Sequence, residues 1–429
     1  MRSALWLLLI GGGAALVSSS VQQTKISNVL IAGSGGSMPP CEPSIAVSRK
    51  DPSKIVAGVI LDRALSSGDG GKTWADQQIT STFGVHGDPT IISDSDGNFY
   101  YFHLSNTGGD GWIDRIVCQK STDGGKTWSK GAGIGHNPPA DQDKHWAVAH
   151  PTKPWLYVTW TQFDKYGSRA PEHKSNIMFS KSEDAGETWS AAQRINEISG
   201  DCLDSDDTTE GAVPAVDTDG NVYVAWSNQG KIFFDKSTDG GKTWMDKDKL
   251  AASHVGGWDM KIPGINRCNG MPVLVVDNST GPHKGTLSIL FADQRFGESD
   301  TDVFLIQSSD KGQTWSKPAR VNQDKSGKQQ FFPWIAIDQT TGYLYVVYYD
   351  RREHEGNETD VYLAWSTDGG KSFKERKISQ SPFVPRQDRF IGDYNNISAH
   401  GGQIAAIWTR MDSGATTVWG AIMKHGELK

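Results

Sequence analysis

The segment Ser67-Gly-Asp69-Gly-Gly71-Lys-Thr73-Trp74 shows a pattern that this chain of 429 residues repeats along most of its length. A carboxylate such as that of Asp69 accepts backbone N–H groups across a turn, while the glycines supply positive φ angles. The hydroxyls add local bonds, and the tryptophan buries its ring where the next strand begins. Each copy is therefore predicted to lock a hairpin. A catalytic role for the aspartates is the alternative, but turn chemistry accounts for every position.

Five further copies of the pattern follow the first one. The final copy ends in Ser372-Phe373 instead of Thr-Trp, and the closing aromatic residues are 54 to 71 residues apart. A period of this kind indicates a repeat architecture. The further copies begin at Ser121, Ser182, Ser237, Ser308 and Ser366.

The residues between these motifs predict the rest of the repeating unit. An apolar strand, a turn and a second strand rich in β-branched and aromatic residues recur, as in 213–216 followed by 221–226. A third strand leads into each motif, and a fourth starts at its tryptophan. Each unit is thus a four-stranded antiparallel meander, and the chain is predicted to be an all-β propeller of such blades.

The first strands of the units number seven, which predicts a seven-bladed propeller; six blades is the alternative. The last unit ends without a motif or a fourth strand, and residues 26–32 are expected to supply the missing outer strand. Closing the ring in this way removes an exposed sheet edge. The first strands begin near Pro43, Pro89, Trp146, Ala212, Pro272, Pro333 and Tyr394.

The N-terminal residues 1–20 are typical of an export signal. Arg2 precedes an apolar run at 4–17, and three serines at 18–20 provide small residues for cleavage. The run is short and interrupted by glycine, which disfavours a membrane span, although an uncleaved tether is the alternative. Residues 21–429 are expected to form one propeller domain, secreted or periplasmic, monomeric and free of the membrane after signal removal.

Charge and cysteine content limit the partners and the redox chemistry. The net charge is −7, and acidic and basic residues are interspersed, whereas a nucleic-acid partner requires a concentrated basic face. An exported protein can oxidise its thiols. Among the four cysteines, Cys202 and Cys268 each precede the first strand of neighbouring units and could form a disulfide.

Three acidic segments bear on metal binding. The turns at 94–98 and 217–221 lack the spacing and the glutamate of a calcium loop, and we interpret them as ordinary turns. The run at 204–207 is either a metal candidate or a solvated loop. No metal or cofactor is predicted.

The six motifs resemble the Asp boxes of the sialidase superfamily, also called BNR repeats. The resemblance implies a propeller fold and glycosidase activity with an arginine triad, a tyrosine–glutamate pair and an acid/base aspartate. The family's Phe/Tyr-Arg-Ile-Pro motif before the first box is absent, and residues 40–45 read Pro-Cys-Glu-Pro-Ser-Ile. Residues 143–146 and 392–394 resemble segments of seven-unit sialidase-like proteins.

Strand order places the loops that enter the first strands, and those joining the second and third strands, on the face opposite the boxes. Ligands of propellers usually bind there, over the axis. These loops are rich in carboxylates and arginines, which suits an acidic sugar. Strand caps and surface ion pairs are the alternative for each single residue. The entry loops contain Glu42, His86, Asp88, Asp143, His145, Glu210, Arg267, Asn269, Gln330, Arg389, Asp393 and Tyr394.

The leading hypothesis is a glycoside hydrolase acting on terminal acidic sugars, similar to an exo-sialidase. Tyr394 is the predicted nucleophile with Glu210 as its base, because a neutral nucleophile avoids repulsion from an anionic substrate. Asp88 is the predicted acid/base. The candidate catalytic residues are Asp88, Glu210, Tyr394 and His145, and the candidate substrate-binding residues are Arg63, Arg295, Arg351, Arg389 and Asp393.

Two alternatives belong to other classes. A polysaccharide lyase for uronic-acid glycans would use histidine and tyrosine for proton abstraction, with His86, His103, His145 and Tyr394 available. A non-catalytic propeller that binds glycans or proteins is the other. The absence of the first sialidase arginine favours it.

Overall fold

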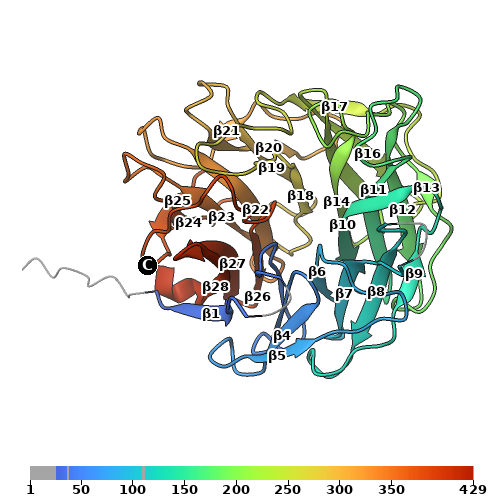
Figure 1. Cartoon of the computed structure of the whole chain (residues 1–429), viewed down its shortest axis with the longest axis horizontal. Coiled ribbons are helices and arrows are strands. Elements are labelled where there is room, and N and C mark those ends of the chain that lie inside the picture. Colours follow the sequence, from blue (N-terminus) through green and yellow to red (C-terminus); the bar gives the residue numbers. More distant parts are fainter. Residues whose placement is uncertain (1–25, 36–37, 109–111, 429) are drawn as a thin grey trace, which may run out of the picture.

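The computed structural model describes residues 26–35, 38–108 and 112–428. In this part of the chain, seven sheets of four antiparallel strands form a closed ring around a central axis (Figure 1). The predicted seven-bladed propeller is confirmed, and the six-bladed alternative is wrong. The predicted export signal at 1–20 lies outside the described residues.

The first three blades follow directly along the chain. Blade 1 contains β2 (Ser44–Val47), β3 (Ile55–Val59), β4 (Arg63–Ser67) and β5 (Ala75–Gln78). Blade 2 contains β6 (Thr90–Ser93), β7 (Phe99–Leu104), β8 (Ile116–Ser121) and β9 (Ala132–Ile134). Blade 3 contains β10 (Asp141–Ala149), β11 (Leu156–Phe163), β12 (Ser175–Ser182) and β13 (Gln193–Arg194).

The next three blades repeat this order. Blade 4 contains β14 (Glu210–Val216), β15 (Val222–Asn228), β16 (Lys231–Ser237) and β17 (Lys249–Ser253). Blade 5 contains β18 (Val273–Val276), β19 (Leu287–Asp293), β20 (Asp302–Ser308) and β21 (Ala319–Arg320). Blade 6 contains β22 (Gln330–Asp338), β23 (Tyr343–Asp350), β24 (Asp360–Ser366) and β25 (Lys374–Lys377).

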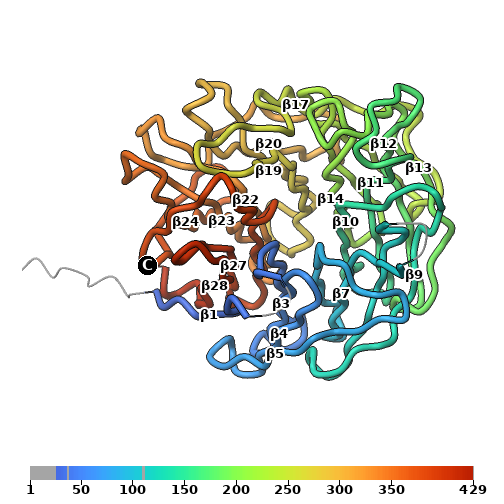
Figure 2. The backbone as a smooth tube through the Cα atoms, viewed as in Figure 1, coloured from blue at the N-terminus to red at the C-terminus, as the bar shows by residue number. Residues whose placement is uncertain are grey.

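Blade 7 joins the two ends of the chain. It contains β26 (Asn396–His400), β27 (Gln403–Asp412) and β28 (Ala415–Lys424), and β1 (Asn28–Ala32) is its outer strand. The blue β1 runs beside the red β28 in Figures 1 and 2, and Asn28 pairs with Ala421. The outer strand predicted at 26–32 is therefore confirmed. A short 3₁₀ helix, η1 (His425–Leu428), follows β28.

The Asp boxes have the predicted hydrogen bonds. In the first box, Asp69 Oδ1 accepts the N–H groups of Lys72 at 2.9 Å and Thr73 at 3.0 Å, while Oδ2 accepts the Thr73 hydroxyl at 2.6 Å. A Cβ atom on Gly71 would lie 2.6 Å from Ile422 of blade 7. The motif therefore both closes its own hairpin and packs on the preceding blade, which is why only glycine fits there.

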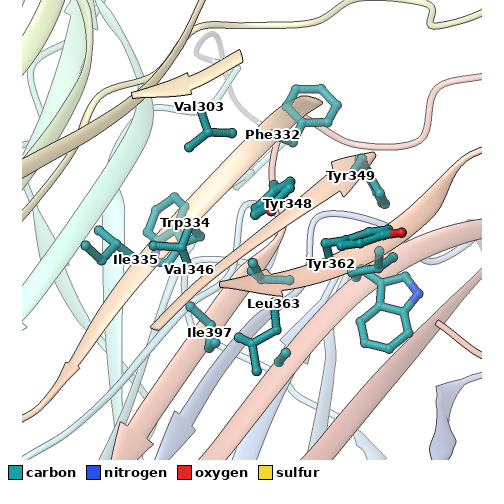
Figure 3. Packing of buried hydrophobic residues seen from close by; sticks show 14 of the residues in the cluster. Val303, Phe332, Trp334, Ile335, Val346, Tyr348, Tyr349, Tyr362, Leu363 and Ile397 are labelled. Carbon is teal, nitrogen blue, oxygen red and sulfur yellow. The ribbon is translucent and has the colours of Figure 1, made fainter. Parts of the chain in front are cut away.

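Apolar and aromatic side chains fill the spaces between the blades. Figure 3 shows this packing around blade 6, where Tyr348, Tyr362 and Leu363 lie beside one another on β23 and β24. On the inner strands, the rings of Trp146 and Trp334 meet with centroids 4.2 Å apart. This contact joins blades 3 and 6, so apolar burial also stabilises the centre of the ring.

The four cysteines are buried and free. The possible Cys202–Cys268 disulfide is not formed, because the two residues are held in separate loops. The carbonyl of Cys202 accepts the N–H of Gly167, while Cys268 forms a β-bridge with Met260. Within the described residues, no helix has the length and apolar character needed to cross a membrane.

Candidate functional site

The backbone is locally strained where several inner strands begin. Glu42, Asp88 and Lys144 each have φ near +50° and lie two residues before the regular part of the strand. In β10, the register with β11 shifts between Asp143 and Trp146, which is a β-bulge at Lys144. Left-handed residues other than glycine cost roughly 1–3 kcal/mol each and concentrate at functional sites. These loops lie on the face opposite the Asp boxes.

Lys144 connects three blades at the axis. Its Nζ atom lies 3.0 Å from Asp393 Oδ2, 3.7 Å from Asp143 Oδ2 and 3.9 Å from Asp88 Oδ2. Its side chain is only 6% exposed. Burial opposes the charge, but Asp143 and Asp393 raise the pKa of Lys144 well above its usual range, so the ammonium group persists.

Arg267 is the second cation of the site. Its Nε atom donates to Asp393 Oδ1 at 2.8 Å, its Nη2 to Oδ2 of the same carboxylate, and its Nη1 to Asp204 Oδ2 at 2.9 Å. Asp204 also accepts the indole N–H of Trp258 and the hydroxyl of Tyr166, both at 2.8 Å. Although burial opposes ionisation, Lys144 and Arg267 lower the pKa of Asp393. The guanidinium therefore holds two loops of the mouth together through a bidentate, charge-assisted pair.

Tyr394 lies directly beneath these charges. It is 5% exposed, and its ring packs against Trp146 at 4.9 Å and Trp334 at 6.3 Å. Burial raises the pKa of its phenol, and the charges of Glu42, Asp88 and Asp393 raise it further. Gly392 lies so close to Glu42 that a Cβ atom on it would be 2.8 Å from the Glu42 nitrogen. The glycine therefore permits the loop that carries Asp393 and Tyr394 to reach blade 1.

Three further carboxyl groups have raised pKa values because they are buried. The pKa of Glu42 and that of Glu210 lie well above the ordinary range, and burial raises the pKa of Asp143 to about 6. The carboxyl oxygens of Glu210 have no hydrogen-bond partner among the described residues. We call Glu42, Asp88, Asp143, Lys144, Asp204, Glu210, Arg267, Asp393 and Tyr394 the central cluster.

The four arginines that were predicted to bind the substrate carboxylate, which we call the arginine clamp, do not come together in the structure. Arg63 pairs with Asp76 at the rim of blade 1, and Arg295 pairs with Asp293 and covers the ring of Phe304 at 4.2 Å. No ion pair of the described residues joins any of the four arginines to the central cluster. The other two are Arg351, which donates to the carbonyl of Pro263 at 2.8 Å, and Arg389, which is exposed. Each of the first three is already engaged by a local partner.

Two of the predicted catalytic residues occupy other roles. The charges that act most strongly on Tyr394 are those of Glu42, Asp88 and Asp393, whereas Asp204 and Lys144 act most strongly on Glu210. His145 is buried, and burial lowers its pKa to about 4, so it stays neutral. Asp88, Asp393 and Tyr394, by contrast, do converge at the axis.

An aromatic wall stands beside the central cluster. The ring of Trp112 is 48% exposed, and its N–H donates to His86 Nε2 at 3.0 Å. Its ring also meets Tyr166 edge-on with centroids 5.5 Å apart. Since Tyr166 bonds Asp204, this wall connects directly to the charged centre. An exposed indole of this kind can stack against the apolar face of a sugar.

Two small hollows open onto the central cluster. One, of about 80 Å³, is lined by Asp204, Trp258, Arg267, Asn269 and Asp393, among others. The other, of about 10 Å³, is lined by Tyr394, Asn269 and Asp393 together with residues of the blade 5 and blade 6 entry loops. Asn269 and Asp393 line both hollows, so these two residues lie between the larger hollow and Tyr394.

Sequence reasoning did not assign the two cations or Asp204. Lys144 stood inside the segment 143–146 that resembles sialidase-like proteins, and Arg267 was among the residues of the entry loops. Asp204 belonged to the acidic run interpreted as a metal candidate or a solvated loop, whereas it accepts bonds from Arg267, Trp258 and Tyr166. The available signal was their position in the sequence: Asp204 and Arg267 lie shortly before an inner strand, and Lys144 lies in the first half of one.

Comparisons with known proteins agree with this architecture. Residues 119–130 match the family model described as BNR/Asp-box repeat. The fold is similar to that of the NanB sialidase from Streptococcus pneumoniae, with a TM-score of 0.50 and 12% identity over 80% of this chain and 68% of that one. It is also similar to a protein of unknown function from Dyadobacter fermentans, with a TM-score of 0.50 and 14% identity over 94% and 98% of the two chains. No curated protein matches the sequence.

The repeated boxes and the closed ring of four-stranded blades define a seven-bladed Asp-box β-propeller. Such a fold hosts both enzymes and binding proteins, so the chemistry has to be argued from the central cluster.

Proposed function

We propose that this protein is an exported glycoside hydrolase that removes terminal acidic sugars from glycans by a sialidase-like mechanism. The observation that carries the proposal is the convergence of a buried tyrosine, carboxyl groups with raised pKa values and two cations on one axis. Groups of this kind divide into nucleophile, base and acid when their environments push their pKa values apart.

Tyr394 is the proposed nucleophile, and Glu42 replaces Glu210 as its proposed base. Burial keeps the phenol protonated, so attack on the anomeric carbon requires a carboxylate to take its proton. Glu42 is the charge that acts most strongly on Tyr394, and its raised pKa makes it a stronger base than an ordinary glutamate once it is ionised. A neutral phenol avoids repulsion from the substrate carboxylate.

The pair Asp88 and Asp143 is the proposed acid/base. Lys144 lies between the two carboxyl groups, 3.9 Å and 3.7 Å away. With a pKa of about 6, Asp143 holds a proton in part of the molecules near neutral pH. One carboxyl group would protonate the leaving oxygen and then take a proton from the water that cleaves the sugar–tyrosine bond.

Arg267 is the proposed contact for the substrate carboxylate. Its side chain is 39% exposed, whereas that of Lys144 is almost fully buried. A guanidinium has five N–H donors, and the bonds to Asp393 and Asp204 use three of them, so one on each terminal nitrogen remains for a substrate carboxylate. Trp112, next to the cluster, would stack on the second sugar, to which the terminal acidic sugar is attached.

The test is release of 4-methylumbelliferone from its α-sialoside and β-glucuronide, with the β-galactoside as a neutral comparison. The proposal requires release from an acidic glycoside and loss of at least about 100-fold in Tyr394→Phe. Tyr345→Phe, a change on β23 of blade 6 where Tyr345 bonds His425, is the control. Turnover that persists in Tyr394→Phe would overturn the assignment.

A non-catalytic glycan-binding propeller is the second candidate. The observation that favours it is that both central cations are already neutralised by Asp393 and Asp204, and that the hollows above them are small. This candidate predicts saturable binding of an acidic glycan without turnover, and no effect of Tyr394→Phe.

A further inference from the structure

A separate cavity lies inside the ring, below the central cluster. Its volume is about 220 Å³, and the inner strands of all seven blades contribute to its walls. β-Branched and aromatic side chains dominate these walls, including Ile45, Val148, Val275, Ile337 and Trp334. Figure 3 shows Trp334, Ile335 and Ile397 on inner strands next to the core of blade 6. We call this cavity the axial channel.

Several polar side chains along the axial channel form hydrogen bonds with the backbone. Ser398 Oγ accepts the N–H of Val47, and Asn396 Oδ1 accepts the N–H of Ile45. At the far ends of the inner strands, Asn278 Nδ2 donates to the carbonyl of Val216, and Gln339 Nε2 to that of Val276. A ligand in the channel therefore meets an apolar surface with few free hydrogen-bonding groups.

Arg49 is the exception among the polar residues that line the axial channel, and we call the end of the channel where it lies the mouth. Its Nη1 atom makes one long contact, 3.4 Å, with the carbonyl of Ala149, and it has no ion pair among the described residues. The nearest acidic charge is Asp94. That carboxylate is occupied by its own turn, where it accepts the hydroxyl of Tyr100 and the backbone N–H groups of Asp96 and Asn98. A half-buried guanidinium without a carboxylate partner has its forked donors available for an anion.

His400 is the other titratable group at the mouth. Burial lowers its pKa, so its ring is neutral at physiological pH and does not repel Arg49 or a second cation. Lys50, next to Arg49, is exposed. Arg49 is therefore the one charge of the described residues that lines the axial channel.

An aromatic floor separates the axial channel from the central cluster. Trp146 and Trp334 line the channel, and both rings pack against Tyr394, which borders a hollow of the central cluster. The two sites thus lie on opposite sides of one aromatic layer. They do not share their polar groups.

We infer that the axial channel is a second binding site, for a small amphipathic carboxylate such as a medium-chain fatty acid. Its apolar chain lies between the inner strands, and its carboxylate pairs with Arg49. The size and the apolar lining match a small aliphatic ligand, and a single cation at the mouth fixes its orientation. This site is independent of the proposed hydrolase activity.

The experiment is calorimetric titration of the full chain with octanoate and, separately, with octanol. Octanoate is expected to bind wild type roughly 10- to 100-fold more tightly than octanol, because only the carboxylate pairs with Arg49. Arg49→Gln is expected to remove this difference, while Lys50→Gln at the exposed neighbouring position preserves it. Absence of octanoate binding to wild type, or equal binding of the two ligands, overturns the inference.

Two variants that fill the channel test the location. Ala147→Trp in blade 3 and Ala336→Trp in blade 6 add a large ring at half-buried positions of the lining. Each folded variant is expected to lose octanoate and octanol together, with circular dichroism as the control for folding. Full octanoate binding in a folded variant contradicts the inference. If neither variant folds, the comparison of Arg49→Gln with Lys50→Gln decides.

Discussion

The ammonium group of Lys144 lies 3.0 Å from the carboxylate of Asp393, although the two residues are 249 positions apart and belong to blades 3 and 7. The same lysine approaches Asp88 of blade 2 and Asp143 of its own blade. One buried cation therefore compensates carboxylates from three blades. It neutralises charges that ring closure brings together.

Removing this cation is expected to destabilise the fold. Lys144→Met removes the cation beside Asp88 and Asp143 and leaves Asp393 with Arg267 alone; breaking a buried ion pair typically costs about 3–5 kcal/mol. Urea denaturation is the measurement, and Lys153→Met at an exposed position is the control. The double variant Lys144→Met/Asp393→Asn is expected to recover part of the loss. If Lys144→Met were as stable as the control Lys153→Met, Lys144 would have no such role.

The base of Tyr394 can be identified by comparing two glutamates. Glu42→Gln is expected to lower kcat/KM by about 10²- to 10⁴-fold, the usual contribution of a positioned base. Glu210→Gln is expected to cause a much smaller loss, because Glu42, Asp88 and Asp393 are the charges that act most strongly on Tyr394, while Glu210 is influenced most by Asp204 and Lys144. Steady-state kinetics on an acidic glycoside, with circular dichroism for folding, gives the comparison. The reverse ranking would restore Glu210 as the base.

The fold could be predicted from the sequence because its determinants are local. The carboxylate of each Asp box accepts its hydrogen bonds within eight residues, so Asp69 could be interpreted without a structure. Counting the inner strands then gave seven blades. Only the last blade lacked an outer strand, so the unassigned segment that forms β1 was expected to pair there. Strand order also placed Asp88, Asp393 and Tyr394 on one face.

The arginine clamp could not be predicted correctly. Strand order predicts on which face of the propeller an arginine lies, but not which group its side chain pairs with. Arg295 bonds Asp293 two residues away, and Arg352 bonds Asp350 in the same arrangement. Such Asp-x-Arg pairs are a local signal for arginines that are already occupied. Lys144 was missed because the direction of its side chain depends on a β-bulge with positive φ. No residue type in the segment 143–146 predicts such a bulge.

The aromatic wall is expected to contribute to substrate affinity. Trp112→Ala removes the exposed ring beside Tyr166 and is expected to raise KM several-fold for a disaccharide-linked acidic sugar. kcat should change little, since Trp112 contacts His86 and Tyr166, which are outside the central cluster. The same variant should have no effect on a short synthetic glycoside that lacks the second sugar. An equal loss on both substrates would mean that the ring serves the fold or the reacting sugar instead.

Stability should be greatest on the acidic side of neutrality. Burial raises the pKa of Asp143 and of Asp350 to about 6 and that of Asp235 to about 7. Since the folded state holds these protons more tightly than the unfolded chain, their stabilising contribution is complete below pH ~4 and is lost as the pH rises through 6 to 7. The box aspartates act oppositely: hydrogen bonds lower the pKa of Asp123 to about 2, so their contribution disappears as the pH falls below ~4.

Glu210 offers a direct test of this pH dependence. Its pKa is raised because its carboxyl group is buried without a hydrogen-bond partner among the described residues, so ionisation destabilises the folded state. Glu210→Gln, which cannot ionise, is expected to raise Tm by a few degrees at pH 8 and to change it little at pH 5. Glu187→Gln at an exposed position is the control, with no pH-dependent difference. A Tm of Glu210→Gln below that of wild type at pH 8 would mean that the ionised carboxylate is stabilised by its surroundings.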